Sequence, residues 1–218
     1  MASFKISPSL ASVPLIKLQE SLLELESAEV DYLHFDVEDG VFVPVMTLGT
    51  KIIADLRPLT KLPFDVHLMV QDPEWLIPEV INAGADRVAV HYEACPYPRR
   101  VLRGIHELGA VPGVAINPAT PLPDLSYLAP YLAYLIILTT EPEGPDCPFL
   151  PEVLSKLTQK QEAPYLQSLE WVVDGGVDQD NVQQVLKAGA DTVVVGRYAF
   201  KGGRIHHNIK QLRAAVKE

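Results

Sequence analysis

The sequence predicts an α/β protein, in which eight strand–helix units close into a single (β/α)8 barrel. Apolar runs rich in Val, Ile and Leu alternate with amphipathic stretches along the whole chain. This alternation is typical of a parallel sheet that is buried on both faces. The chain has 218 residues, and eight units of roughly 27 residues each suit a closed barrel. No linker or change in composition divides the sequence, so we expect residues 1–218 to form one domain.

A short motif marks the repeat. Residues 28–31 (AEVD), 83–86 (AGAD) and 188–191 (AGAD) each follow an amphipathic stretch and precede an apolar run. The three aspartates lie 55 and 105 residues apart, so the second interval is close to twice the first. Gly84 and Gly189 suit the left-handed position that ends a helix. The motif therefore indicates a strand–helix unit that recurs at a regular interval.

Eight apolar runs are the expected strands. They are Phe4–Ser7, Tyr32–Val37, Leu62–Val70, Arg87–Tyr92, Val111–Ile116, Tyr134–Thr139, Leu169–Asp174 and Thr192–Gly196. Helical patterns lie between them, at Leu15–Leu25, Pro73–Ala85, Asn181–Leu186 and His207–Val216. An open, doubly wound sheet is the alternative, but the first turn reads PSLASVP and lacks the glycine-rich fingerprint of that fold.

Composition restricts the partners. Lys and Arg number 18 against 28 Asp and Glu, a net charge of −10, and no basic run stands out. We therefore expect neither nucleic acid nor an anionic membrane surface as a partner. The two cysteines, Cys95 and Cys147, are too few for a disulfide framework. The N-terminal residues show no signal-like apolar segment, and no run of about 18 apolar residues occurs. We expect a cytoplasmic protein.

Two histidine–aspartate pairs are the most informative residues. His34 and Asp36 are separated by one apolar residue, and so are Asp65 and His67. Strand residues i and i+2 point to the same face, so each pair projects from one side of its strand. Ionisable groups in apolar strands are costly unless they are paired or bind a metal, which suggests a site.

In a (β/α)8 barrel, functional groups gather at the carboxyl ends of the strands. Ser9, Met69 and Asn117 lie near such ends, as do the two pairs and Asp174. His34, Asp36, His67 and Asp174 make a plausible site for one divalent metal ion (Zn²⁺, Fe²⁺ or Mn²⁺). Asp65 would then orient His67 rather than bind the metal. For any single residue, a satisfied hydrogen bond inside the barrel is the alternative.

Asp36 and Asp174 also suit proton transfer. They come from the second and seventh expected strands, which lie on nearly opposite sides of a barrel. One carboxylate could remove a proton next to a carbonyl and the other return it to the opposite face, while the metal stabilises the enediolate. This arrangement describes an epimerase. The alternative is that both carboxylates only bind metal.

The last two loops carry the candidates for phosphate binding. Gly175 and Gly176 follow the seventh strand, and Gly196 and Arg197 follow the eighth. Backbone amides in these loops often bind a phosphate in such barrels. The glycines could instead simply form the turn, and Arg197 could instead be solvated or bind a neighbouring helix.

The sequence resembles the ribulose-phosphate 3-epimerase family in segments that cover nearly the whole chain. These segments are ISPSLAS (6–12), LHFDVEDGVFVP (33–44), LPFDVHLMV (62–70), VAVHYEA (88–94), GVAINPATP (113–121), VVDGGV (172–177) and AGADTVVVG (188–196). The resemblance implies a TIM barrel that interconverts D-ribulose 5-phosphate and D-xylulose 5-phosphate by inversion at C3. It also implies a homo-oligomer, since members are commonly dimers or hexamers.

The resemblance also implies residue roles. The family's metal ligands fall on His34, Asp36, His67 and Asp174, and its acid/base pair falls on Asp36 and Asp174. Its substrate-contacting serine and histidine fall on Ser9 and His67. Met69 matches one of the methionines that form an uncharged floor under the enediolate.

Three departures separate this chain from the family pattern. Glu38 and Leu138 stand where the family has methionine. Residues 140–149 read TEPEGPDCPF where the family has VNPGFGGQxF, so the glycine-rich stretch that closes over substrate is missing. In its place stand two acidic residues, Glu143 and Asp146, and two prolines without an amide donor, Pro145 and Pro148. Arg197 replaces a serine and could compensate for the lost amides. An epimerase for a different ketose or ketose phosphate, and a non-catalytic barrel that binds a ligand or partner, are the alternatives.

Overall fold

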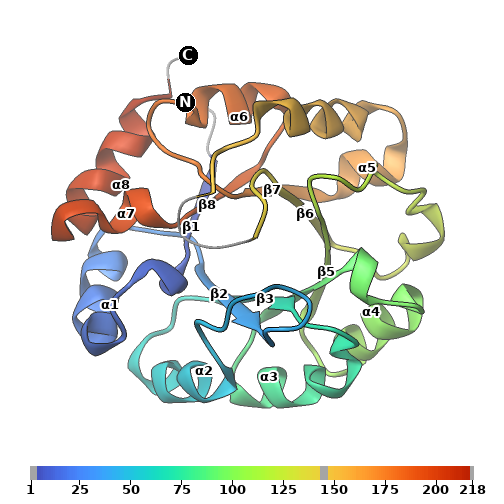
Figure 1. The fold of residues 1–218 in the computed structure, drawn as a ribbon, viewed down its shortest axis with the longest axis horizontal. Helices are drawn as coiled ribbons and strands as arrows, with labels where there is room; N and C mark the ends of the chain where they lie inside the picture. The colour runs from blue at the N-terminus through green and yellow to red at the C-terminus, as the bar shows by residue number, and fades with distance from the viewer. Residues whose placement is uncertain (1–3, 143–146, 217–218) are drawn as a thin grey trace.

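The computed structural model describes residues 4–142 and 147–216, and within them eight parallel strands form one sheet. The strands are β1 (Lys5–Pro8), β2 (Leu33–Glu38), β3 (Phe64–Met69), β4 (Arg87–His91), β5 (Val111–Ile116), β6 (Tyr134–Leu138), β7 (Glu170–Asp174) and β8 (Thr192–Val195). Their order is β1-β8-β7-β6-β5-β4-β3-β2, and a parallel bridge between Ser9 and His34 brings the two ends together. The strands therefore surround a common axis inside a ring of helices, which confirms the predicted barrel (Figure 1).

Helices connect the strands. They are α1 (Leu18–Ser27), α2 (Thr50–Leu56), α3 (Ile77–Ala83), α4 (Pro98–Glu107), α5 (Pro164–Ser168), α6 (Val182–Ala188), α7 (Arg197–Phe200) and α8 (Ile205–Ala214), with a long 3-10 segment at Pro151–Gln161 before α5. Each predicted strand overlaps an observed one, with ends that differ by at most two residues. Gly84 and Gly189 both end helices with φ of +119°, as predicted.

The aspartates of the recurring motif tie the amino ends of the strands together. Asp31, Asp86 and Asp191 each accept a hydrogen bond from a backbone N–H at the start of another strand, at 2.8, 2.7 and 2.8 Å. Each also contacts a basic side chain from elsewhere in the chain. The motif is thus a structural device at the end of the barrel opposite the expected site.

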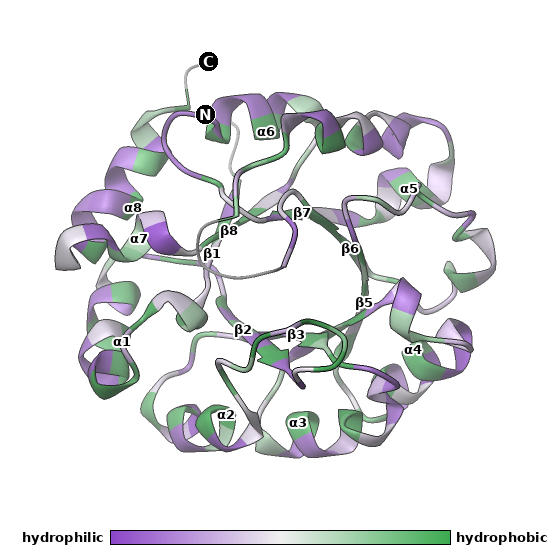
Figure 2. Cartoon of the chain, viewed as in Figure 1, coloured by the Kyte–Doolittle hydropathy of each residue, from purple (hydrophilic) through white to green (hydrophobic). Residues whose placement is uncertain are grey.

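Apolar side chains fill two layers. The larger layer lies between strands and helices, and α4 shows how it forms: Val101, Leu102 and Ile105 are buried, while Arg99 and Arg103 are exposed. Figure 2 shows this alternation around the helix ring. A smaller apolar cluster lies inside the barrel and consists of Ala89, Ala115, Tyr134, Ile136, Leu138, Val172 and Val194. Its residues come from β4–β8, whereas the inward side chains of β2 and β3 include the polar His34, Asp36, Asp65 and His67.

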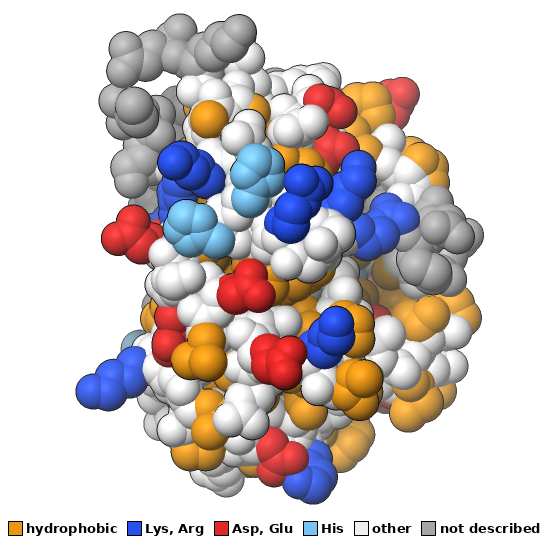
Figure 3. Space-filling model, turned by 90° about the vertical axis from the view of Figure 1, so that its left-hand side faces the viewer, with side chains coloured by type: hydrophobic (Ala, Val, Ile, Leu, Met, Phe, Trp, Pro, Cys, Tyr) orange, Lys and Arg blue, Asp and Glu red, His pale blue; other side chains and the backbone are white. Residues whose placement is uncertain are grey.

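The surface carries a basic flank on an acidic protein. Exposed Lys, Arg and His side chains gather over α7 and α8 (Figure 3); they are Lys201, Arg204, His206, His207 and Lys210. Among the residues that the structure describes, no helix is both long enough and apolar enough to cross a membrane.

Candidate metal and proton-transfer site

Four side chains converge at the carboxyl end of the barrel. His34 and Asp36 come from β2, His67 from β3 and Asp174 from the end of β7, and one nitrogen or oxygen atom of each lies within 4.8 Å of all the others. Both histidines are fully buried. The structure thus brings together the four residues that the sequence suggested as metal ligands.

Strand geometry explains the convergence. His34 and Asp36 point inward from alternate positions of β2, and the register between β2 and β3 places Asp36 beside His67. Asp174 ends β7 on the other side of the interior and reaches the same point. Its Oδ2 atom lies 3.5 Å from His34 Nε2 and 3.5 Å from His67 Nδ1.

The polar atoms at the centre of the cluster lack hydrogen bonds. His34 Nε2, His67 Nδ1 and Asp36 Oδ1 are buried and have no hydrogen-bond partner, although they lie at ion-pair distances of 3.2 to 3.4 Å. Buried polar atoms are rarely left unsatisfied. Two imidazole nitrogens and two carboxylate oxygens are ligands that Zn²⁺, Fe²⁺ and Mn²⁺ accept, so these residues fit a divalent cation.

Electrostatics support the same conclusion. Burial by itself would lower the pKa of His34 and His67, but the neighbouring carboxylates outweigh it and raise both. Burial would conversely raise the pKa of Asp36 and Asp174, yet the two imidazoles hold both below their usual values. The centre of the cluster therefore favours positive charge, which a divalent cation would supply.

Asp65 orients a different histidine from the one that the sequence suggested. Its Oδ2 atom lies 3.0 Å from His34 Nδ1, and the register pairs His34 with Asp65 on the adjacent strand, so the expectation that it would orient His67 was wrong. Tyr134 donates a hydrogen bond to the other oxygen of Asp65 at 3.1 Å. Arg87 Nε lies 3.4 Å from the same oxygen and continues a line of charges toward the amino end.

His67 contacts a third histidine, His91, which was not among the predicted site residues. His67 Nε2 lies 2.9 Å from His91 Nε2, and His91 Nδ1 lies 3.3 Å from a carboxylate oxygen of Glu93. Burial lowers the pKa of His91 to about 4, against the opposing effect of Glu93. The spacing of His91 and Glu93, at the end of β4, is the same i, i+2 pattern that marked the other pairs.

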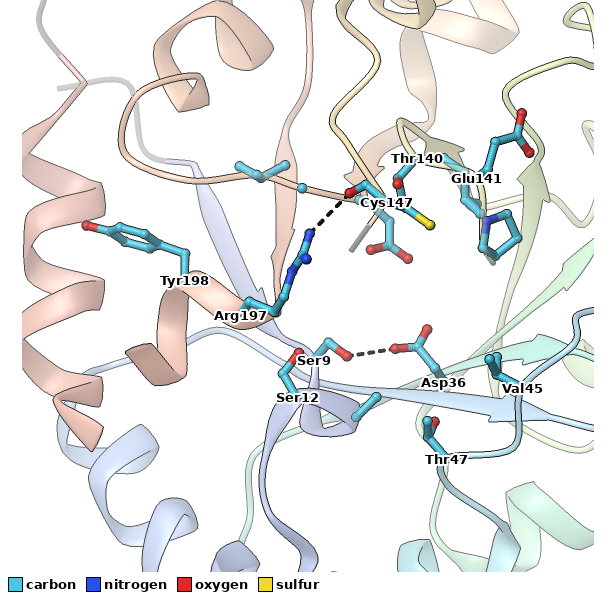
Figure 4. Close-up of a pocket in the computed structure, with 18 of the residues that line it drawn as sticks. Ser9, Ser12, Asp36, Val45, Thr47, Thr140, Glu141, Cys147, Arg197 and Tyr198 are labelled. Carbon is cyan, nitrogen blue, oxygen red and sulfur yellow. Dashed lines mark hydrogen bonds between the residues drawn. The ribbon is translucent and has the colours of Figure 1, made fainter. Parts of the chain in front are cut away.

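A cavity of about 840 Å³ opens beside the cluster. Asp36 and Asp174 line it, together with Ser9, Ser12 and Met69. Ser9 donates a hydrogen bond of 2.6 Å to Asp36 Oδ2, and Figure 4 shows the two side chains pointing toward one another. This bond leaves Asp36 Oδ1 facing the two histidines.

Glu38 lines the cavity but is held by a neighbouring loop. Its Oε2 atom accepts hydrogen bonds from the backbone N–H and the hydroxyl of Thr47, at 2.6 and 2.7 Å. Burial and the charge of Asp36 raise the pKa of Glu38, against these hydrogen bonds. Met69 and Leu138 line the same cavity, so an apolar surface remains beside the added carboxylate.

The turn after β7 approaches other backbone closely. Gly175 and Gly176 have φ of +117° and +69°, and a Cβ atom at Gly175 would lie 2.8 Å from the backbone nitrogen of Thr140. Only glycine fits such a position without strain. At the turn after β8, a Cβ atom at Gly196 would meet Ser12 Oγ at 2.8 Å. Both turns border the cavity.

Arg197 links the turn after β8 to the divergent loop. Its guanidinium donates a hydrogen bond of 3.2 Å to the backbone oxygen of Cys147, across the cavity (Figure 4). Glu141, Pro142 and Cys147 line the cavity from that loop. Glu143, Pro145 and Asp146, for which the sequence predicted added negative charge and a lost amide donor, lie outside the residues that the structure describes.

The fold and the site together define a (β/α)8 barrel with a histidine-and-carboxylate cluster that fits a divalent metal ion. Comparison with known proteins identifies the family. The model of the ribulose-phosphate 3-epimerase family matches residues 5–200. Ribulose-phosphate 3-epimerase of Synechocystis sp. is 39% identical over 199 residues, covering 89% of this chain and 86% of the relative. Its counterpart in Bacillus subtilis is 34% identical over 214 residues, covering 97% and 99%. The chain belongs to the ribulose-phosphate 3-epimerase family.

Solved structures agree on the fold alone. A 3-hexulose-6-phosphate synthase aligns with a TM-score of 0.68 at 17% identity, covering 98% of this chain and 100% of that one. KGPDC from Streptococcus mutans aligns with a TM-score of 0.71 at 13% identity, covering 98% and 97%.

Proposed function

We propose that this protein is a metal-dependent epimerase that inverts C3 of D-ribulose 5-phosphate and D-xylulose 5-phosphate through an enediolate. One observation carries the proposal: the buried carboxylate of Asp36 on β2 and the partly buried carboxylate of Asp174 on β7 converge with two buried imidazoles beside a large cavity. Membership of the family supports the substrate class.

In this proposal, Asp36 and Asp174 exchange the roles of base and acid on opposite faces of C3. His34 and His67 complete the ligand set of one divalent metal ion, which is Zn²⁺, Fe²⁺ or Mn²⁺. When bound, the metal supplies Lewis-acid stabilisation of the negative charge that develops on the substrate oxygens. The hydrogen bond from Ser9 orients Asp36 toward the cluster.

The remaining contacts would hold the substrate. Ser9 and Met69 line the cavity and would border the sugar, with Met69 providing an apolar surface near the enediolate. His67 is fully buried and outside the lining of the cavity, so it would act on the substrate through the metal. Backbone amides of Gly175, Gly176 and Gly196 would bind the phosphate, as such turns do in related barrels.

Arg197 would add a charge-assisted contact to the phosphate. The basic flank over α7 and α8 adjoins this end of the cavity, since Lys201 belongs to both. Positive charge there would favour entry of an anionic substrate into a protein of net charge −10.

A second candidate is an epimerase for a different ketose or ketose phosphate. Glu38 and Glu141 both line the cavity, where they add negative charge and hydrogen-bond acceptors for sugar hydroxyls. A substrate with more hydroxyl groups than a ketopentose phosphate would use such acceptors.

Isotope exchange tests the proposal. Protein loaded with Zn²⁺, Fe²⁺ or Mn²⁺ is incubated with ribulose 5-phosphate in deuterated water, and NMR follows both deuterium at C3 and the appearance of xylulose 5-phosphate. We expect both signals from the wild type and no xylulose 5-phosphate from Asp36→Asn or Asp174→Asn. Exchange at C3 of ribulose 5-phosphate should be lost in the variant whose replaced carboxylate faces that proton. Asp55→Asn, at an exposed position on α2, is the matched control.

The possible results separate the candidates. Absence of exchange with all three metals would exclude the pentose phosphate activity. Exchange with a different ketose or ketose phosphate at a higher kcat/KM would favour the second candidate.

Two further properties belong to the same proposal. We place the protein in the cytosol, where its two free cysteines would stay reduced. We also propose a homo-oligomer, because Leu15, Ile16 and Leu23 are 57%, 93% and 67% exposed near α1. Light scattering of the purified protein would reveal a mass above 24.0 kDa if this is correct.

A further inference from the structure

The environment of His67 contains two residues that no role in the proposed chemistry explains. His91 is fully buried, and its ring faces His67 with an interplanar angle of 22° and packs against Phe42 at a centroid distance of 4.6 Å. Glu93 holds the far side of His91 and also accepts a hydrogen bond of 2.9 Å from the backbone N–H of Asn117. The three side chains His67, His91 and Glu93 therefore form a continuous chain away from the metal cluster.

The positions of the protons along this chain follow from the geometry. His67 directs Nδ1 toward Asp36 and Asp174, so a metal bound there needs the lone pair of Nδ1. Neutral His67 must then carry its proton on Nε2, which lies 2.9 Å from His91 Nε2. His91 Nε2 can accept that hydrogen bond only if the proton of His91 is on Nδ1.

Glu93 favours that tautomer of His91. A carboxylate accepts hydrogen bonds and donates none, so it selects the form of His91 with a proton on Nδ1. Along the series Glu93, His91 and His67, each residue thus determines which nitrogen of the next imidazole carries the proton, and this leaves the Nδ1 lone pair of His67 free.

We propose that His91 and Glu93 are positioning residues that fix the tautomer and the ring orientation of His67, so that its Nδ1 lone pair points at the metal. The proposal rests on the proposed function, because it takes His67 as a metal ligand. The two histidines are then oriented in different ways. The carboxylate of Asp65 contacts Nδ1 of His34 directly, whereas the imidazole of His91 lies between His67 and the carboxylate of Glu93. Partners of this kind commonly change metal affinity by about 10- to 100-fold.

The first test measures Zn²⁺ affinity by competition with a chromophoric chelator. His91→Phe keeps an aromatic ring against Phe42 but removes the acceptor, and we expect Zn²⁺ to bind about 10- to 100-fold more weakly. His91→Gln places an amide oxygen near the position of Nε2, so we expect it to restore affinity to within about threefold of the wild type. His106→Phe, at an exposed position on α4, is the matched control and should bind Zn²⁺ like the wild type.

The second test needs no variant. Long-range ¹H–¹⁵N NMR of the Zn²⁺-loaded wild type should show His67 protonated on Nε2 and His91 protonated on Nδ1. A proton on Nε2 of His91 would overturn the proposal even if His91→Phe does not fold.

The two proposals fail in different ways. Wild-type affinity in His91→Phe, in a protein whose wild type binds Zn²⁺ and epimerises, would overturn the positioning role alone. A wild type that binds no Zn²⁺, Fe²⁺ or Mn²⁺ would overturn the metal-dependent function and, with it, the positioning role.

Discussion

Replacement of Asp65 by Asn tests the contact that orients His34 and the row of buried charges that continues from Asp65 to Arg87 and Glu170. Asp65 is fully buried, lies 3.0 Å from His34 and 3.4 Å from the guanidinium of Arg87, and accepts a hydrogen bond from Tyr134. Arg87 continues to Glu170, which also binds Lys5, so a line of alternating charges runs from the metal cluster to the amino end of the barrel. The asparagine has the same size but removes the negative charge from the middle of this line.

The expected loss of stability is about 3 kcal/mol. Breaking a buried ion pair by removing one partner costs about 3–5 kcal/mol, because the other charge stays buried. Arg87 keeps two contacts of 3.1 Å with Glu170 and lies 4.0 Å from the ring centre of Tyr134, so the low end of that range applies. For a domain of this size, each kcal/mol lowers Tm by about 2–4 °C.

Equilibrium unfolding of the metal-free protein in urea measures this loss. Asp55→Asn provides the control, because Asp55 and its partner Lys51 are 53% and 84% exposed and such pairs contribute under about 1 kcal/mol. Burial would raise the pKa of Asp65, but Arg87 and His34 hold it below the usual value. The carboxylate therefore stabilises the fold above about pH 4 and loses this effect as the pH falls through its folded-state pKa.

The wild type and Asp65→Asn should accordingly converge in stability in acid. A loss at pH 7 no larger than that of Asp55→Asn would refute the reasoning. So would a difference between wild type and Asp65→Asn that stays constant as the pH falls below about 4.

Substitutions at three other residues test the cavity. Glu38→Met and Glu38→Gln each remove a negative charge whose repulsion destabilises the enediolate by about 1 kcal/mol, so we expect kcat to rise roughly fivefold. A lower kcat in both variants would mean that the Glu38 carboxylate assists the reaction. Gly175→Ala would place a Cβ atom 2.5 Å from Thr140 Cγ2. We therefore expect the free energy of unfolding in urea to fall by at least about 2 kcal/mol and KM to rise. An unchanged urea midpoint would contradict the expected steric strain at this position. Arg197→Ala should raise KM for the sugar phosphate about tenfold while kcat stays within about twofold; an unchanged KM would mean that Arg197 serves only the loop.

The barrel could be predicted because its strands repeat a strong local signal. The apolar runs of β5 and β6 contain few polar residues, and the limits predicted for both strands agree with the observed ones to within one residue. The helix ends at Gly84 and Gly189 were equally clear, because few residues other than glycine adopt their positive φ. The first copy of the motif lacks a glycine, yet Glu29 takes φ of +54° at the corresponding bend. Arg213 donates a hydrogen bond of 2.9 Å to the backbone oxygen of Glu29, so a tertiary contact supports a conformation that the local preference disfavours.

Side-chain partners across strands were harder to predict than strands. The i, i+2 pattern correctly placed Asp65 and His67 on one face, but it led to the incorrect pairing of these two residues. The register between β2 and β3 decides the pairing instead, because it sets Asp65 beside His34 and Asp36 beside His67. A shift of two residues would preserve every inward-facing position and change every partner.

The same reasoning explains why His91 and Glu93 were missed. The segment VAVHYEA was recognised for its similarity to the family, yet its histidine and glutamate show the spacing that had marked His34 with Asp36. Their importance depends on contacts with β3 and the loop after β5, which no local pattern reveals. If His91→Phe weakens Zn²⁺ binding while His91→Gln restores it, then the i, i+2 spacing identifies three histidine–carboxylate pairs at one end of this barrel. Only two of them supply metal ligands, and the third acts through His67.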